Sequence, residues 1–260
     1  MARAAAITFN TALPVSQEEF ILREQLVISG AASALGSRDE QVLDTVLGYG
    51  ITPKLALFGV LPVVRAEVST ALGNETEAGI GDATIFARYE AFRQDGAGAT
   101  LRVAPFLGVR LPSTTSNLLG DGSTDALLGV IATAATTKRT FDAQVAAELN
   151  SASNGVRAGH QVSLDLSLQY RAWPETVAQT TKGFVYAVIE SSLVYQGRSR
   201  SGASSLDDTG GLQWFLIPGV QYVRQRWIAD LAVKIPVATN LNGVALRTDY
   251  SVLASIRVNF

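Results

Sequence analysis

The 260-residue chain contains no cysteine, one histidine and few charged residues. The absence of cysteine excludes disulfides and thiolate metal sites. Charged residues make up 17% of the chain, against about a quarter in ordinary soluble domains, so they cannot cover a surface that faces water on all sides. The net charge of −2 argues against a nucleic-acid-binding surface. We expect no metal site, no cofactor and no nucleic-acid partner.

Long apolar runs are also missing. The two longest, residues 55–64 and 126–135, are about half the roughly 20 residues that an apolar helix needs to span a bilayer, and Gly or Pro interrupts each. No segment has helical periodicity, and the chain carries 23 glycines. These observations predict an all-β protein.

Alternation of residue character is clearest between Gly79 and Pro112. Two alternating runs lie on either side of residues 95–98, which predicts an antiparallel hairpin. Side chains alternate across a strand, so one face of each run is almost purely apolar and the other carries ionised groups. Each run has roughly ten to thirteen residues, close to the length of a tilted strand that crosses a bilayer.

The same pattern recurs along the chain and predicts about twelve strands: 20–30, 42–51, 54–64, 82–90, 100–112, 124–136, 140–150, 161–171, 183–196, 212–222, 227–237 and 248–260. Residues 65–78, 113–123, 151–159 and 197–210 are predicted polar loops. An even number of strands returns both termini to the periplasm. We therefore predict a single antiparallel transmembrane β-barrel over residues 20–260.

Alternation alone does not say which face points outward, because a soluble sandwich or barrel would bury the apolar face. The polar faces, however, carry only a few charges per strand, which suits a lumen better than a water-facing surface. Aromatic residues also lie on the apolar parity near strand ends, where membrane barrels place their interface girdles: Tyr49, Tyr89, Tyr170, Tyr195, Tyr222, Trp227 and Phe260. We therefore expect the apolar face to contact the lipid bilayer of a bacterial outer membrane.

Residues 1–19 show no regular alternation. They form either a loosely held periplasmic tail or a segment tucked into the lumen as a plug, and the tail is the commoner arrangement for a chain terminus. The start of the chain lacks the apolar core of a signal peptide, whereas Ala2, Arg3 and Ala4 have the small-x-small form of a cleavage site. We expect an exported protein whose signal peptide is absent from this numbering.

Charged residues on the lumen parity are the candidate functional residues: Asp82, Arg88, Glu90, Arg102, Arg110, Asp142, Glu148, Asp165, Arg171, Glu190, Asp230, Lys234, Asp249 and Arg257. Charges in a narrow lumen can line a polar path and tune its selectivity. They can also pair across strands and simply fill the interior. We expect the structural role for most single residues and contact with solute for some.

The residue spacing argues against two possible sites, a catalytic dyad and a calcium loop. His160 and Ser163 differ by an odd number, so they project to opposite faces of a regular strand and do not form a catalytic dyad there. Residues 121–125 place oxygen ligands at alternate positions, as calcium loops do, but Ala126 and Ala132 stand where such a loop needs glycine and glutamate. We predict no catalytic residue and no metal ligand.

Several short motifs, in order, resemble the outer-membrane transporter family named for the MetA pathway of phenol degradation: Thr52–Leu55, Gly79–Asp82, Arg88–Tyr89, Arg102–Thr114, Gly122–Asp125 and Ile256–Phe260. The resemblance runs from about Phe9 to the C-terminus. One departure is Ser113, Thr114, where the family commonly has Thr, Gly. The resemblance implies passage of small molecules, including aromatic or hydrophobic ones, across the outer membrane.

The last strand, residues 250–260, alternates and ends in Phe260, which resembles the terminal signal that outer-membrane barrels present to their assembly machinery. The sequence therefore predicts an outer-membrane channel or transporter that passes small molecules passively. Two alternatives stay open. The lumen is closed by side chains and the barrel serves a structural or loop-mediated binding role, or the barrel is a lipid-ester hydrolase that uses His160.

Overall fold

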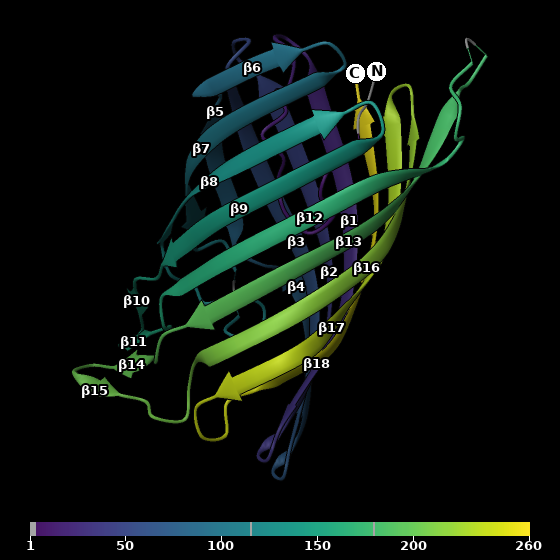
Figure 1. Ribbon diagram of the computed structural model, residues 1–260. Coiled ribbons are helices and arrows are strands. Elements are labelled where there is room, and N and C mark those ends of the chain that lie inside the picture. The colour runs from purple at the N-terminus through teal and green to yellow at the C-terminus, as the bar shows by residue number, and fades with distance from the viewer. Residues whose placement is uncertain (1–3, 115, 179) are drawn as a thin grey trace.

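The computed structural model describes residues 4–114, 116–178 and 180–260, and its regular structure is β-strand throughout those residues. No helix in these ranges is long and apolar enough to cross a membrane. One large antiparallel sheet forms a barrel, and the two marked chain ends lie together at one end of it (Figure 1).

The barrel sheet contains fourteen strands, and β2 pairs both β1 and β3, so the sheet closes on itself. Its strands are β1 (Phe20–Ser33), β2 (Gly36–Gly50), β3 (Leu55–Thr70), β4 (Gly73–Ile80), β5 (Ala83–Tyr89), β6 (Phe92–Gly96), β7 (Ala99–Leu111), β8 (Asp125–Thr136), β9 (Arg139–Leu149), β12 (Gln161–Trp173), β13 (Gly183–Gln196), β16 (Gly211–Arg224), β17 (Trp227–Leu241) and β18 (Arg247–Asn259). The three pieces β4, β5 and β6 follow one another as a single interrupted strand, which makes twelve transmembrane strands. The predicted all-β, twelve-stranded antiparallel barrel is confirmed.

One predicted loop is wrong. Residues 65–78 form most of a hairpin, in which β3 continues to Thr70 and β4 starts at Gly73. Figure 1 shows this hairpin and the β1–β2 hairpin projecting beyond the rest of the barrel, at the end away from the termini. Beyond a bilayer both faces of a strand meet water, so the sequence loses the apolar face that marks a strand.

Four short strands lie outside the barrel sheet. They are β10 (Ala152–Ser153), β11 (Val156–Arg157), β14 (Arg200–Ser201) and β15 (Ser204–Ser205), and they pair in that order. They belong to the connections after β9 and β13, both of which were predicted as plain loops. Figure 1 places them together at the barrel end opposite the chain termini.

The outer face of the barrel is apolar. Its exposed side chains include a Leu, Ile or Val at successive outward positions of most strands, as in Val162, Leu164, Leu166 and Leu168 of β12. The six predicted interface aromatics that lie in strands point outward and are at least partly exposed, and Phe260, which follows the end of β18, is exposed at the terminal mouth. Tyr222 contacts Trp227 at one end, with 5.2 Å between ring centroids. A surface of this composition suits lipid and not water.

We predict that Leu166→Arg destabilises the barrel. Val162 pairs with the interfacial Tyr195, and Tyr170 lies eight positions further along β12, so Leu166 is midway between the two interfaces. An arginine at that depth is expected to cost about 2–4 kcal/mol. Unfolding by guanidinium in lipid vesicles measures the change.

The matched control is Leu72→Arg, in the turn between β3 and β4, where the leucine is 100% exposed. This substitution is expected to change the free energy of unfolding by about 0.5 kcal/mol or less. Equal effects of the two arginines would contradict the assignment of the outer face to lipid.

Candidate solute path through the barrel lumen

The N-terminal segment, residues 4–19, enters the barrel and runs through its lumen before β1 begins. Ala4, Ala5, Ala6 and Ile7 are buried, and Ile7 is 0% exposed. Ile7 belongs to an apolar cluster on the inner face of β13, β16, β17 and β18, whose other buried members are Ala4, Phe184, Tyr186, Val188, Phe215, Ile217, Val223, Ile228, Ala232 and Leu253. Burial of this kind removes the apolar side chains of the segment from water.

Inward-facing polar side chains hold the backbone of residues 5–8. The Ala5 N–H donates to Gln221 Oε1, and Gln221 Nε2 donates to the Ala5 carbonyl, both over 3.1 Å. Glu190 accepts from the Ile7 N–H (2.7 Å), the Thr8 N–H (3.1 Å) and the Thr8 hydroxyl (2.6 Å). A buried carboxyl group needs hydrogen-bond partners in place of water, and the segment supplies three of them. Glu190 therefore acts as the main acceptor for the segment.

A second set of contacts holds residues 11–13. The guanidinium of Arg88 donates to the carbonyls of Thr11 and Leu13, the latter over 2.7 Å, and stacks over the Phe58 ring at 4.9 Å. The Thr11 hydroxyl donates to Asp142 Oδ1 over 3.0 Å. Phe58 and Arg88 come from β3 and β5, across the barrel from β13, whereas Asp142 lies on β9, which only β12 separates from β13. The segment is thus bridged across the lumen.

The segment leaves the lumen beside the start of β1. Val15 packs into an inner apolar cluster with Ala56, Phe58 and Phe86. The Glu18 N–H donates to the Gly50 carbonyl over 2.8 Å, at the end of β2. The chain turns there with Glu18 at φ 63°, in the left-handed region. This hydrogen bond marks the point where the part of the segment inside the lumen ends and the barrel wall begins.

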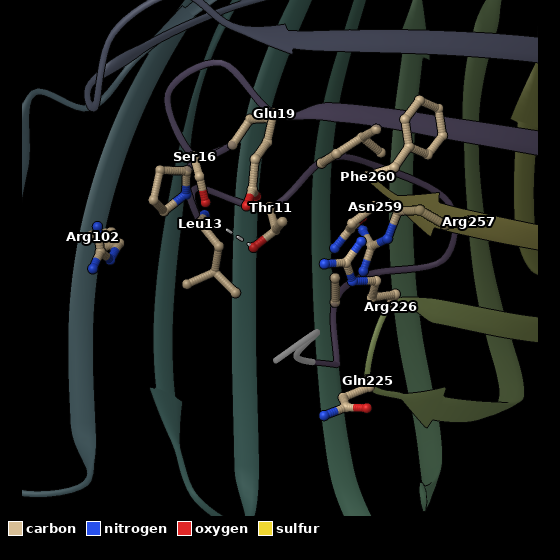
Figure 2. Close-up of a pocket in the computed structure, with 14 residues that line it drawn as sticks. Thr11, Leu13, Ser16, Glu19, Arg102, Gln225, Arg226, Arg257, Asn259 and Phe260 are labelled. Carbon is tan, nitrogen blue, oxygen red and sulfur yellow. Dashed lines mark hydrogen bonds between the residues drawn. The ribbon is translucent and has the colours of Figure 1, made fainter. Parts of the chain in front are cut away.

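Cavities lie on both sides of the segment. One of about 420 Å³ is bounded by Thr8, Phe9 and Asn10 and by wall residues toward the loop end, including Arg110 and Glu148. Another, of about 720 Å³, opens at the end that holds the termini and is lined by Thr11, Leu13 and Ser16 among others (Figure 2). A solute that crosses the barrel would have to pass from one to the other through the space that the segment fills.

The cavity at the terminal end is rich in arginine. Figure 2 shows Arg226 and Arg257 close together on one side and Arg102 on the opposite wall, with Glu19 as the acidic residue among the lining side chains. Arg102 forms an ion pair with the buried Glu90. Arg226 and Arg257 outnumber Glu19 among the remaining charged side chains of the lining, and an excess of cationic groups attracts anions.

The predicted lumen residues fall into groups. Arg88, Asp142 and Glu190 contact the N-terminal segment. Two ion pairs, Arg110 with Glu148 and Arg102 with Glu90, join neighbouring parts of the wall. The first is bidentate, with distances of 2.6 and 2.8 Å.

The other predicted residues have separate environments. Asp82 accepts from the Ser113, Thr114 and Gly122 N–H groups and so joins the two ends of the connection between β7 and β8. Asp165 and Asp230 accept hydrogen bonds from wall side chains. Two cationic side chains lie over aromatic rings: Lys234 over Phe215, at 4.1 Å, and Arg171 over Phe184, at 5.6 Å. Asp249 is exposed at the loop end, paired with Arg247 over 2.9 Å.

Sequence reasoning missed four residues that hold the segment. Arg23 and Gln25 of β1 both donate to the Ile7 carbonyl, and Gln221 makes the contacts with Ala5. The Thr133 hydroxyl of β8 accepts from the Ala12 N–H over 2.8 Å. In β1 the outward-facing Glu24 lies between Arg23 and Gln25, so both faces of the strand carry polar groups. The sequence of β1 therefore does not show which residues face the lumen. Gln221 follows the inward parity of β16 and could have been found from its position opposite Asp230.

His160 and Ser163 have different partners. His160 Nδ1 accepts from the Asn150 N–H over 3.0 Å, and the Ser163 hydroxyl donates to Asp165 over 2.8 Å. Among the described residues no group of three or more His, Asp or Glu side chains could hold a metal ion.

The sequence matches the model of one protein family over residues 30–240, a family described by the MetA pathway of phenol degradation. The chain belongs to this family. A search of curated proteins finds no match.

Solved structures share the fold. An outer membrane channel from Pseudomonas putida F1 superposes with a TM-score of 0.70 and 16% sequence identity, over 96% of this chain and 97% of that one. The β domain of the Bordetella autotransporter BrkA follows with a TM-score of 0.56 and 13% identity, over 94% of this chain and 100% of that one. The fold of this family member is therefore that of an outer-membrane β-barrel.

We predict that Glu190→Ala loosens the N-terminal segment. The chain has no cysteine, so a single cysteine introduced at Ile7 reports access of a maleimide reagent to the segment. Hydrogen bonds to a charged group contribute about 1.5–3 kcal/mol each, so the labelling rate at position 7 is expected to rise by at least about tenfold.

Glu148→Ala is the matched control, because Glu148 lies in the lumen but pairs with Arg110 and not with the segment. It is expected to leave labelling at position 7 unchanged. If both alanine variants label at the same rate, Glu190 does not hold the segment.

Proposed function

We propose that the protein is a passive channel of the bacterial outer membrane and that residues 4–17 are a plug that closes it at rest. The observation that carries the proposal is that residues 4–17 fill the lumen between two cavities. The plug contributes no strand to the sheet. Its withdrawal would leave the strand-to-strand hydrogen bonds intact and would join the cavities into one path.

The contacts of the plug support a reversible closure. Its backbone is held by side chains of Glu190, Gln221 and Arg88, and water could replace these partners. The anchor at Glu18 and Gly50 would keep the plug attached to the barrel. Solute movement has no energy source in this arrangement, so it follows the concentration gradient.

The proposed solutes are small molecules. The family is described by a pathway of phenol degradation, which supports small aromatic compounds as candidates. The arginines at the terminal mouth favour those that carry a carboxylate or another anionic group. The inner face also offers aromatic rings, such as Phe58, Phe86 and Phe106, that such solutes can contact.

Two other functions are less well supported. A purely structural barrel needs no terminal segment to close its lumen, because larger inward side chains would do so. A hydrolase needs a base beside a nucleophile, and His160 and Ser163 each engage another partner.

The terminal strand has a further part in this proposal. β18 pairs with β1, so its arrival closes the barrel. We place both termini in the periplasm, where Phe260 would be presented to the assembly machinery.

Deletion of residues 2–17 is predicted to increase single-channel conductance severalfold in planar lipid bilayers, because it empties the space between the two cavities. A potassium chloride gradient in the same bilayers is expected to give a reversal potential that favours chloride, since arginine dominates the mouth.

The full chain, refolded and measured in parallel, is the control and is expected to show mostly closed intervals. A heat-modifiable band on a gel verifies that the deletion variant forms a barrel. Unchanged conductance in a folded deletion variant would contradict the plug.

A further inference from the structure

The four short strands β10, β11, β14 and β15 have no part in the solute path. They form their own sheet at the loop end of the barrel, with Ala152, Arg157, Arg200 and Ser205 in one row across it. Three members of this row, Arg157, Arg200 and Ser205, line a cavity of about 860 Å³. One face of the small sheet therefore covers this cavity.

The cavity opens on the outside of the barrel. Its other wall includes Val162, Tyr195 and Leu212, which belong to the outward faces of β12, β13 and β16. They are 46%, 55% and 36% exposed. The same outward faces continue toward the other end of the barrel as the apolar, lipid-facing surface. The cavity is thus apolar on the side of the barrel wall and cationic on the side of the small sheet.

The arginines of the cavity lack enough carboxylate partners to balance their charge. Arg157 and Arg200 stand directly opposite each other in the pairing of β11 with β14. Like charges at directly opposite positions destabilise an antiparallel pair. Within the described parts of the chain, neither guanidinium has an ion-pair or hydrogen-bond partner. Arg198 lines the same cavity and pairs with Asp207 over 3.0 Å, so this single carboxylate does not neutralise the group.

His160 adds a neutral donor to the cavity. Its Nδ1 accepts the Asn150 N–H, so this nitrogen carries no proton and the ring proton lies on Nε2. Nε2 is then available to donate to a ligand in the cavity that His160 lines. An anion with several oxygens would satisfy the histidine and the opposed arginines together.

We propose that this cavity binds the phosphorylated headgroup of a lipid in the outer leaflet of the membrane. The phosphate lies between Arg157 and Arg200, and an acyl chain crosses the row formed by Val162, Tyr195 and Leu212 to reach the apolar outer face. The unpaired arginines favour a phosphate because its charge is opposite to theirs. The apolar surface that adjoins the cavity favours a ligand with an acyl chain, which is a lipid. The inference rests on the proposed function, which places the termini in the periplasm and therefore the loop end outside the cell.

The test uses native mass spectrometry of the full chain in detergent, with diphosphorylated lipid A as the probe. The wild type is expected to retain one lipid. The double variant R157Q/R200Q is expected to bind at least about tenfold more weakly, because it loses two charge-assisted hydrogen bonds. R157K/R200K keeps both charges and is expected to retain most of the binding.

R247Q is the matched control. Arg247 lies at the same end but pairs with Asp249 and does not line the cavity, so lipid binding is expected to match the wild type. Heat-modifiable mobility on a gel verifies that each variant is folded, and conductance is not a readout. A failed channel proposal would therefore leave this result intact.

Three results would overturn the inference. The double variant could bind lipid A as tightly as the wild type. Phosphatidylcholine, which has no net charge, could bind as tightly as lipid A. Inorganic phosphate could displace the lipid at millimolar concentration, which would assign the cavity to a soluble anion.

Discussion

A bilayer offers no hydrogen-bond partners to peptide groups, and this constraint shapes every part of the protein. Twelve strands satisfy it by closing into one sheet, in which β1 pairs with β18 and β2 with β3. Closure also creates an interior that must be filled or hydrated. The N-terminal segment fills part of it, and its own peptide groups then need partners from the wall.

Those partners explain why the lumen carries charge. Glu190 accepts three hydrogen bonds from the segment, and Arg88 donates to two of its carbonyls. Of the charges that do not contact the segment, Arg110 pairs with Glu148 and Arg102 with Glu90, whereas others, such as Asp165 and Asp230, accept hydrogen bonds from neutral wall side chains. The inner face therefore combines ion pairs and hydrogen bonds within the wall with a set of contacts that hold the N-terminal segment.

The barrel could be predicted from sequence because its signal is local. Side chains alternate with period two, so a strand such as 161–171 is visible by itself. The position of the N-terminal segment depends on contacts between distant residues, such as Ile7 with Glu190, 183 positions apart. No short pattern contains that information. The hairpin over residues 65–78 was missed for a different reason, since strands outside a bilayer have no apolar face.

The central claim is that the segment leaves the lumen while the barrel stays folded. Hydrogen exchange of the full chain in lipid nanodiscs tests it most directly. The account predicts that the amide protons of Ile7, Thr8 and Ala12 exchange far faster than those in the middle of β12 and β13, through an opening that spares the sheet. Exchange of both sets at one common rate would mean that the segment is released only by global unfolding, and would contradict the account.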